Sequence, residues 1–402
     1  MKLALFIPSL EVGGAERQMI MLAKSLMQNG HTVSLWCLRE TGAFVAEARD
    51  YGIPVLSVDK GGRYDLIGAA LRLRKICLQD APEIIISCLP SANLYGLFAR
   101  IVGPTIEGRK PRLIWNLASA QLPVGEYGWW AKISYWVQAR SARLADKVVV
   151  NSVAGSVSAR AENYPEDKLM VIHNGVDMER FAFDAAAGRN WRADMGIPPE
   201  VRLVGMVGRL DPAKSYEVFL AACSYAVQRD DGVHFVIIGG GDNDYATQIM
   251  AQILLHPLFG RRLFHKPSET NMPAAYSALD LMTMTSKSEG LPNTVVEAMA
   301  CEKPCVVTDV GDCRLAVDRF GKVCEVGDVE GIANAWLSLL AGLDDNQSIA
   351  RGESHHPDNP VSHKADDFSE IRNYMEQTFS LEKMTSRFES LCLELLTEGR
   401  GE

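Results

Sequence analysis

No run of apolar residues in this 402-residue sequence approaches the length of about 18 that a membrane-spanning helix needs. A signal peptide is lacking too, because one lysine and a short apolar run are followed at once by charges at Glu11 and Glu16. The sequence also contains neither Gly-x-Gly-x-x-Gly nor Gly-Lys-Ser/Thr, the fingerprints of dinucleotide and P-loop sites. These absences argue against a transmembrane protein and against NAD-type and P-loop enzymes. We expect a protein of the cytoplasm or of the cytoplasmic face of a membrane.

Cysteine patterns typical of metal or redox sites are absent as well. The nine cysteines include no Cys-x-x-Cys pair, and most lie inside apolar runs such as residues 84–89. Cys301, Cys305 and Cys313 are close in sequence, but no histidine lies near them, so we do not expect a zinc site. The pattern favours buried free thiols in a reducing compartment.

The charge is unevenly divided along the chain. With 41 basic against 50 acidic residues the net charge is −9, which argues against nucleic acid as a partner. Residues 1–173 hold 20 Lys and Arg against 15 Asp and Glu, and the remainder holds 21 against 35. The resulting charges of +5 and −14 predict two domains that face different partners.

Short apolar runs alternate with segments of helical periodicity along the first part of the chain. The runs are typical of buried parallel strands and occupy residues 2–8, 32–38, 54–58, 84–88, 112–116, 146–151 and 169–172. Helical periodicity lies between them, for example over residues 15–28, 65–78 and 93–102. This order predicts a doubly wound parallel sheet of the α/β class.

The same alternation restarts after the segment HNGVD at residues 173–177. Strand-like runs occupy residues 202–207, 233–238, 262–264, 281–284 and 304–308, with helical segments between them. Two such sheets predict a cleft between two domains, lined by the carboxyl ends of the strands. Residues 344–367 are rich in Asp, Asn, Ser, His and Pro, and we expect a surface loop or a disordered insertion there.

Two loops after predicted strands have the composition of a phosphate site. Gly13 and Gly14 allow a ligand to approach the backbone, and the helix that follows presents its N–H groups. In GRLDPAK, residues 208–214, Arg209 and Lys214 are cations that could neutralise a diphosphate. A tight turn for the first loop and solvated surface charges for the second are alternatives that these residues leave open.

A third motif, SEGLPNTVVEAMA at residues 288–300, combines a turn with a helix start. Pro292 suits the first turn, and the N–H groups of about residues 293–295 would be available to phosphate oxygens. Glu297 could accept hydrogen bonds from a ribose diol, and Glu289 could reach the hydroxyls of a bound sugar. The alternative for Glu297 is an acidic residue that is simply favourable at a helix start.

Taken together, GGAER, HNGVD, GRLDPAK and Glu-x7-Glu occur in the order expected of glycosyltransferase family 4, which the sequence resembles over about residues 1–330 and again at FSLEKM, residues 379–384. The resemblance implies a GT-B fold of two Rossmann-like domains facing a cleft, and retaining transfer from a nucleotide sugar. It also implies a last helix that crosses back. We therefore predict an acceptor domain over residues 1–173 with 380–402, and a donor domain over residues 174–379.

The resemblance also implies residue roles. Arg209 and Lys214 match the pair that clamps the diphosphate, and Glu289 matches the carboxylate that contacts the transferred sugar. The implied donor-binding residues are Gly13, Gly14, Gly239, Gly240, Lys266, Asn293, Thr294 and Glu297. Glu16 and Asn116 are candidates on the acceptor side. Asn116 and Lys266 depart from the family pattern, which often has His and Gly there, and Ser215 stands where Gly is usual.

Retention without a paired carboxylate nucleophile fits a front-face displacement, in which Arg209, Lys214 and helix N–H groups stabilise the departing diphosphate. The segment 242–244, Asp-Asn-Asp, superficially resembles a metal-binding Asp-x-Asp. It lies at a glycine-rich turn in the wrong domain for that role, so a turn or helix cap is favoured. We expect neither a metal requirement nor a cofactor.

Tryptophan is concentrated in one basic segment, which bears on the acceptor. Four of the seven tryptophans lie in it, interleaved with basic residues: Trp115, Trp129, Trp130 and Trp136, with Lys132, Arg140, Arg143 and Lys147. An interfacial helix on anionic lipid has this composition, and ordinary helix packing is the alternative. A saccharide on a lipid carrier, such as polyprenyl diphosphate, is the acceptor that this segment indicates.

We therefore expect a transferase of a hexose or N-acetylhexosamine in cell-surface polysaccharide or glycolipid synthesis, peripheral on the inner face of the cytoplasmic membrane. A UDP-linked donor is favoured and a GDP-linked one stays open. Two alternatives remain: a nucleotide-sugar 2-epimerase of the same fold, and a non-catalytic nucleotide-sugar-binding partner subunit.

Overall fold

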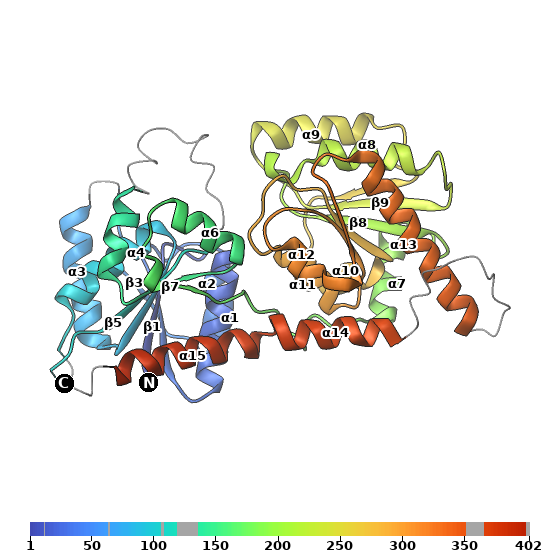
Figure 1. Cartoon of the computed structure of the whole chain (residues 1–402). Coiled ribbons are helices and arrows are strands. Elements are labelled where there is room, and N and C mark those ends of the chain that lie inside the picture. The colour runs from blue at the N-terminus through green and yellow to red at the C-terminus, as the bar shows by residue number, and fades with distance from the viewer. Residues whose placement is uncertain (12, 63–64, 106–107, 119–135, 351–365, 399–402) are drawn as a thin grey trace. The chain divides into compact units, whose positions relative to one another are not determined.

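The computed structural model of the chain describes residues 1–11, 13–62, 65–105, 108–118, 136–350 and 366–398 (Figure 1). It divides into two compact units, each built on one sheet. The first unit comprises Met1–Gly175 and Leu381–Glu402, and the second comprises Val176–Ser380.

The sheet of the first unit has seven strands, all parallel. They are β1 (Lys2–Ile7), β2 (Thr32–Cys37), β3 (Val55–Ser57), β4 (Ile84–Cys88), β5 (Arg112–Asn116), β6 (Lys147–Val150) and β7 (Leu169–Val171), in the spatial order β3-β2-β1-β4-β5-β6-β7. The order reverses between β1 and β4, which is the position where open α/β sheets bind ligands. All seven strands overlap the predicted ones.

Helices cover both faces of this sheet because side chains of alternate parity point to opposite sides. Leu3, Leu5 and Ile7 of β1 join one core cluster, and Ala4 and Phe6 join the other. The first cluster is covered by α1 (Gly14–Gln28), α2 (Phe44–Asp50) and α15 (Leu381–Thr397). The second is covered by α3 (Leu66–Asp80), α4 (Pro90–Val102), residues 136–141, η1 (Ala142–Leu144) and α6 (Val153–Ala161).

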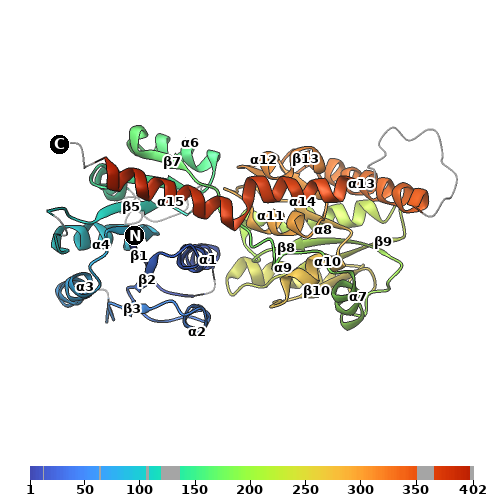
Figure 2. The same ribbon diagram turned by 90° about the horizontal axis from the view of Figure 1, so that it is seen from below.

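The last helix packs on the first unit, as predicted, beside α1 (Figures 1 and 2). Its apolar stripe, which includes Phe388, is buried in the core cluster below α1. Polar contacts fix its position, because Thr385 Oγ1 donates to Ser25 Oγ at 2.9 Å and Asn29 Nδ2 donates to Glu389 Oε1 at 2.9 Å.

The second unit repeats this architecture with six parallel strands. They are β8 (Arg202–Val207), β9 (Val233–Ile238), β10 (Leu263–Lys266), β11 (Leu281–Met284), β12 (Cys305–Thr308) and β13 (Lys322–Cys324), in the order β10-β9-β8-β11-β12-β13. One face is covered by α7 (Ala185–Asp194), α10 (Met272–Ala278), α11 (Asn293–Ala300), α12 (Cys313–Val317) and α14 (Asp366–Phe379). The other is covered by α8 (Tyr216–Ala226), α9 (Asp244–Leu255) and α13 (Val329–Ala350).

The polar insertion predicted over residues 344–367 is wrong at both of its ends. Helix α13 continues to Ala350, and α14 begins at Asp366. The sequence analysis missed α14, which lies beside α11 (Figure 2) and buries Ile371, Met375 and Phe379 at intervals of four residues. Residues 351–365 lie outside the described part of the chain.

All nine cysteines lie in the described part of the chain, and all are free thiols. Eight are buried, and Cys324 is half-buried. Burial raises the pKa of the Cys77 thiol to about 11, so it stays protonated at neutral pH. Among the described residues, no helix has the length and apolar character that crossing a membrane would require.

Candidate functional site

An ion pair lies where the strand order of the second unit reverses. The loops that follow β8 and β11 are neighbours, and they bring Lys214 Nζ to 2.5 Å from Glu289 Oε1. Ser286 Oγ also donates to Glu289 Oε1, at 2.6 Å. Thr285 Oγ1 joins the two loops by donating to the carbonyls of Lys214 and Ser215. Two residues separated by 75 positions in sequence thus share one polar centre at the carboxyl edge of the sheet.

The loop that carries Lys214 is shaped by its own backbone. Asp211 caps the short helix η3 (Pro212–Lys214) by accepting from the Ala213 amide at 3.0 Å. Ser215 then adopts a left-handed conformation, with φ 53°, to enter α8. Tyr216 follows and donates its hydroxyl to the Gly208 carbonyl at 2.6 Å. Burial, above all, raises the pKa of Tyr216, so this hydroxyl remains a donor at any physiological pH.

Two glycines that follow β9 let backbone segments approach one another closely. An ideal Cβ on Gly239, whose φ is 144°, would lie 1.9 Å from the Gly208 carbonyl oxygen. A Cβ on Gly240 would lie 2.9 Å from the carbonyl oxygen of Pro267. The Gly-rich turn therefore supports the loop that carries Arg209 and Lys214, and only glycine fits at position 239.

Gly311 is a site-building residue that the sequence analysis missed. Its φ is 56°, and an ideal Cβ there would lie 2.4 Å from the carbonyl oxygen of Glu289 and 2.5 Å from that of Gly290. The Asp312 amide donates to the Gly290 carbonyl at 2.8 Å, which holds the two loops together. A glycine three residues after the predicted strand at residues 304–308 was the signal available in the sequence.

Helix α11 places Asn293 and Thr294 in its first turn and Glu297 one turn later, all three half-buried. The amides of Val295 and Val296 both donate to the Pro292 carbonyl. The amide of residue 295 is therefore already used, so the prediction that the amides of residues 293–295 are available is wrong for residue 295.

Glu297 is held from below by a buried tyrosine. Tyr276 Oη donates to Glu297 Oε2 at 2.9 Å from α10. Burial first, and then the Glu297 carboxylate, raise the pKa of Tyr276 well above its usual value. This hydrogen bond fixes the orientation of the Glu297 carboxylate. Nothing in the sequence indicated that Tyr276 and Glu297 would be in contact.

The two remaining cations of the predicted site differ in their surroundings. Arg209 is exposed and has no ion pair among the described residues. Lys266 pairs with Glu269 Oε2 at 2.7 Å and lies 5.5 Å from the centre of the Trp191 ring. Burial alone would raise the pKa of Glu269, but hydrogen bonds from Lys266 and Trp191 outweigh it and lower the pKa to about 2.

The candidates of the first unit lie at the carboxyl edge of its own sheet. Gly13 precedes α1 in an extended conformation, and an ideal Cβ on it would lie 2.1 Å from Glu16 Oε2, so the Glu16 side chain folds back over Gly13. Gly14 is the exposed first residue of α1. Asn116 ends β5, and its Oδ1 accepts from the Ala118 amide at 3.1 Å.

The segment 242–244 forms a helix start. Asn243 caps α9 by accepting from the Ala246 amide at 2.7 Å, and Asp244 is the first residue of that helix. Across the part of the chain that the structure describes, no group of three or more His, Cys, Asp or Glu side chains is arranged to hold a metal ion.

Two family profiles match the chain, one over most of the first unit and one within the second. The profile described as Glycosyltransferase Family 4 matches residues 12–180, and the one described as Glycosyl transferases group 1 matches residues 201–342. The chain belongs to glycosyltransferase family 4. The second match contains Arg209, Lys214, Glu289 and Glu297, and the first contains Gly13, Gly14, Glu16 and Asn116.

Two relatives named for their activities each match one part of this family 4 chain. A D-inositol 3-phosphate glycosyltransferase of Saccharomonospora viridis is 27% identical over 223 residues, which are 53% of this chain and 51% of that protein. A UDP-Gal:α-D-GlcNAc-diphosphoundecaprenol α-1,3-galactosyltransferase of Escherichia coli is 30% identical over 179 residues, which are 43% of this chain and 45% of that protein. The chain thus spans about half the length of the curated relatives it matches.

Solved structures match nearly the whole chain. HepE of Anabaena, solved in complex with UDP, aligns with a TM-score of 0.79 and 20% identity, covering 98% of this chain and 100% of that one. Sucrose-phosphate synthase of Thermosynechococcus elongatus aligns with a TM-score of 0.74 and 17% identity, covering 99% and 100%. These likenesses establish the predicted GT-B fold.

Proposed function

We propose that this chain is a retaining glycosyltransferase that moves a hexose or N-acetylhexosamine from a nucleotide diphosphate sugar to a saccharide acceptor. The donor is UDP-linked, and the acceptor is carried on a lipid such as polyprenyl diphosphate. The reaction belongs to the synthesis of cell-surface polysaccharide or glycolipid, and it takes place at the inner face of the cytoplasmic membrane.

The observation that carries the proposal is the Lys214–Glu289 pair at the reversal point of the second sheet. Glu289 pairs with Lys214, and exposed Arg209 lies in the same loop. A diphosphate would take the place of Glu289 as the partner of Lys214. The freed carboxylate would then accept hydrogen bonds from hydroxyls of the sugar.

The same residues account for retention. Arg209, Lys214 and the first amides of α11 would stabilise the negative charge that develops on the departing diphosphate. The leaving phosphate would accept the proton of the acceptor hydroxyl on the face it departs from, so that the new bond forms on that face. No step requires a metal ion, and we expect EDTA to leave activity unchanged.

The choice of donor and acceptor rests on the relatives. The E. coli galactosyltransferase is named for a UDP-galactose donor and a diphosphoundecaprenol-linked acceptor, and HepE was solved with UDP. The positive charge of residues 1–173 supports an anionic surface as the setting of the acceptor.

The first test is calorimetric binding of UDP and of GDP to the purified chain, with Lys214→Ala and Glu297→Ala beside it. Each variant removes one charge-assisted contact, so we expect UDP affinity to fall by about tenfold to a hundredfold. Lys287→Ala is the matched control, because Lys287 is an exposed lysine that pairs with Glu217.

Each outcome decides one part of the proposal. Binding of GDP but not UDP would leave the site in place and overturn the donor. Unchanged affinity in both variants would overturn the site. Incubation of a bound UDP-sugar without acceptor separates the alternatives: a new free nucleotide sugar would mean an epimerase, and binding that never leads to transfer onto any lipid-linked saccharide would mean a non-catalytic subunit.

A further inference from the structure

Exposed apolar side chains are concentrated on one layer of the first unit. Sixteen large hydrophobic residues are exposed in the described part of the chain, and ten of them lie on the helices over the face formed by α3, α4 and α6. These ten are Leu66, Ile67, Leu71, Leu78, Ile101, Trp136, Val137, Leu144, Val153 and Val157. The opposite layer of the same unit, which contains α1, α2 and α15, exposes Leu393 alone among the described residues of this kind.

Helix α3 carries apolar residues on its solvent side as well as on its core side. Ala69, Leu73 and Cys77 recur every four residues and are fully buried. Ile67, Leu71 and Leu78 follow a second stripe on the outer side, with 79%, 64% and 42% of their surface exposed. An ordinary surface helix has charged or polar residues in that position, so this stripe is an apolar surface that none of the described residues of its unit covers.

The same layer carries more cations than anions among its described residues. In the described parts of residues 65–160 there are eleven Lys and Arg against four Asp and Glu. The four acidic residues are all engaged inside the unit: Asp65 with Arg72, Asp80 with Lys2 and Trp36, Glu83 with the Lys2 amide, and Asp146 with Arg100 and Arg112. Arg74 and Lys75, within the outer stripe of α3, are exposed.

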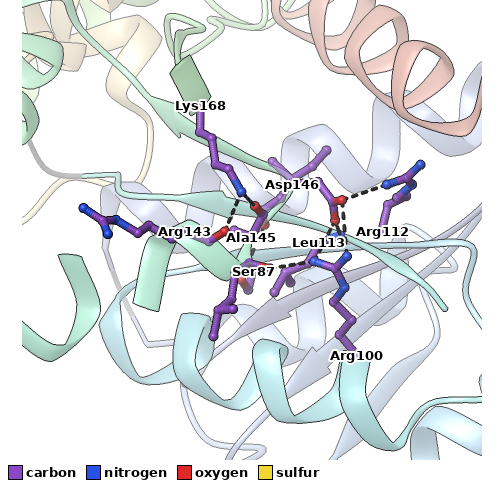
Figure 3. Close-up of polar contacts among 10 residues, drawn as sticks. Ser87, Arg100, Arg112, Leu113, Arg143, Ala145, Asp146 and Lys168 are labelled. Atoms are coloured by element: carbon purple, nitrogen blue, oxygen red, sulfur yellow. Dashed lines mark hydrogen bonds and ion pairs between the residues drawn. The ribbon is translucent and has the colours of Figure 1, made fainter. Parts of the chain in front are cut away.

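Figure 3 shows the contacts of one of these acidic residues, Asp146, inside the first unit. Asp146 is approached by Arg112 Nη1 at 2.9 Å and by Arg100 Nη1 at 3.0 Å, and it accepts from the Leu113 amide at 2.7 Å. Lys168 donates to the carbonyls of Arg143 and Ala145. The guanidinium of Arg143 extends away from this cluster, so the framework is held rigid while the cation stays at the surface.

The tryptophans of the segment that the sequence indicated have different environments in the structure. Trp115 is fully buried in the core, so it cannot take part in an interfacial surface. Trp136 is 62% exposed, and the Arg140 guanidinium lies 5.5 Å from the centre of its ring. Trp129, Trp130 and Lys132 lie outside the described residues. The surface that the structure supports is therefore centred on α3 and includes only the described end of the segment that the sequence indicated, residues 136–144.

We propose that the outer face of α3, together with Ile101 of α4 and residues 136–144, docks on an anionic lipid bilayer. Apolar side chains would enter the headgroup region while Arg74, Lys75, Arg140 and Arg143 contact lipid phosphates. Uncompensated cations spread among apolar side chains over several elements match a fluid anionic surface. A protein partner would instead present acidic side chains at fixed positions. This inference deepens the membrane setting of the proposed function, and vesicle binding needs no nucleotide sugar, so the two proposals fail independently.

The test is co-sedimentation of the full chain with vesicles of equal parts phosphatidylglycerol and phosphatidylcholine, and with vesicles of phosphatidylcholine alone. Arg74→Glu/Lys75→Glu should lower partitioning onto the anionic vesicles by about thirtyfold or more. Ile67→Ser/Leu71→Ser should lower it by about tenfold, because two apolar side chains no longer enter the interface.

Two control variants change equally exposed residues elsewhere. Leu254→Ser/Leu255→Ser removes exposed apolar residues from α9, and Arg189→Glu/Arg261→Glu reverses two exposed cations of the second unit. Both should pellet like wild type, and all four variants should bind UDP like wild type.

Wild type that stays in the supernatant with anionic vesicles, or α3 variants that pellet as well as wild type, would overturn the proposal. Equal binding to phosphatidylcholine vesicles would overturn its electrostatic part. Sedimentation velocity without lipid tests whether a second copy of this chain occupies the surface instead. A dimer that the α3 variants abolish would show that it does, and would overturn the proposal.

Discussion

The two units of this chain share one architecture but differ in how the loops at the carboxyl ends of their strands are held. In the second unit, Gly239 and Gly311 lie against backbone atoms of neighbouring loops, and Lys214 pairs with Glu289 across the point of order reversal. In the first unit, Gly42 likewise lies against the Leu10 backbone, but the close neighbour of Gly13 is the end of the flexible Glu16 side chain. The second unit therefore presents a pre-formed polar centre, and the first presents, at Gly13, a loop that can adjust.

The two units also differ in how many large hydrophobic residues they expose on their outer surfaces. The second unit has five exposed large hydrophobic residues in the described part of the chain, and the first has eleven, ten of them on one layer. A fixed site suits a ligand of constant structure, such as a nucleotide diphosphate. An adjustable edge beside an apolar, cationic layer would suit the lipid-carried acceptor that we propose. The same fold is thus specialised by its loops and its outer helix faces.

The largest expected effect tests the rigid edge against the adjustable one. Gly239→Ala should lower the free energy of unfolding by about 3 kcal/mol or more, because the new Cβ meets a backbone carbonyl at a positive φ. Gly13→Ala should cost less than about 1 kcal/mol, since Glu16 can swing away. Urea unfolding measures both, and equal losses would remove the distinction between the two edges.

A second test concerns the buried carboxylate beside Lys266. The pKa of Glu269 is lowered to about 2 in the folded chain, below its value in the unfolded chain. It therefore contributes stability that is complete above about pH 5 and is lost as the pH falls toward 2. From pH 6 to pH 3, wild type should lose about 2 kcal/mol more than Glu269→Gln. Parallel losses in thermal unfolding at the two pH values would show that the ion pair is absent in solution.

A third test isolates the tyrosine below Glu297. Tyr276→Phe should destabilise the chain by about 1 to 2 kcal/mol and weaken UDP binding several-fold, because Glu297 loses a hydrogen bond that aims it. Tyr225→Phe is the matched control. Tyr225 also donates to a carboxylate, that of the exposed Glu330, which is far in sequence from the motif that contains Glu297. If both variants bound UDP alike, Tyr276 would have a structural role only.

The smallest effect is a gain of stability. Ser215 is fully buried in a left-handed conformation, and its hydroxyl has no hydrogen-bond partner within the described structure. Ser215→Gly should raise the free energy of unfolding by about 1 kcal/mol. Asn163→Gly, at φ 65° in the first unit, should gain only a few tenths, because Asn tolerates this conformation. A loss of stability in Ser215→Gly would mean that the hydroxyl has a partner.

Long periodic segments were predictable from the sequence, and short or weakly patterned ones were not. Strands β1 to β7 overlap the predicted apolar runs because a strand buried on both faces is apolar throughout. The three-residue β13 was missed, since Lys-Val-Cys between Gly321 and Glu325 forms no apolar run, whereas the equally short β3 and β7 lie inside such runs. Helix α14 was missed because many polar residues surround Ile371, Met375 and Phe379, and its helical spacing was taken for part of a polar insertion.

At the candidate site the sequence provided the residues, and the tertiary structure decided their partners. Arg209, Lys214, Glu289 and Glu297 were named from local motifs, since each motif is contiguous in the chain. The pairing of Lys214 with Glu289, the support of Glu297 by Tyr276 and the contact of Gly311 with the Glu289 loop join segments far apart in sequence.

By itself, then, the sequence determined the fold class, the two sheets and the chemistry available at their edges, because these depend on local periodicity and residue type. Only the tertiary structure decided that Trp115 is core, that the last helix, whose return to the first unit was predicted, lies beside α1 there, and that α3 turns an apolar stripe to the solvent. The reason is physical: burial and pairing depend on which segments are adjacent in space, and strand order sets that adjacency.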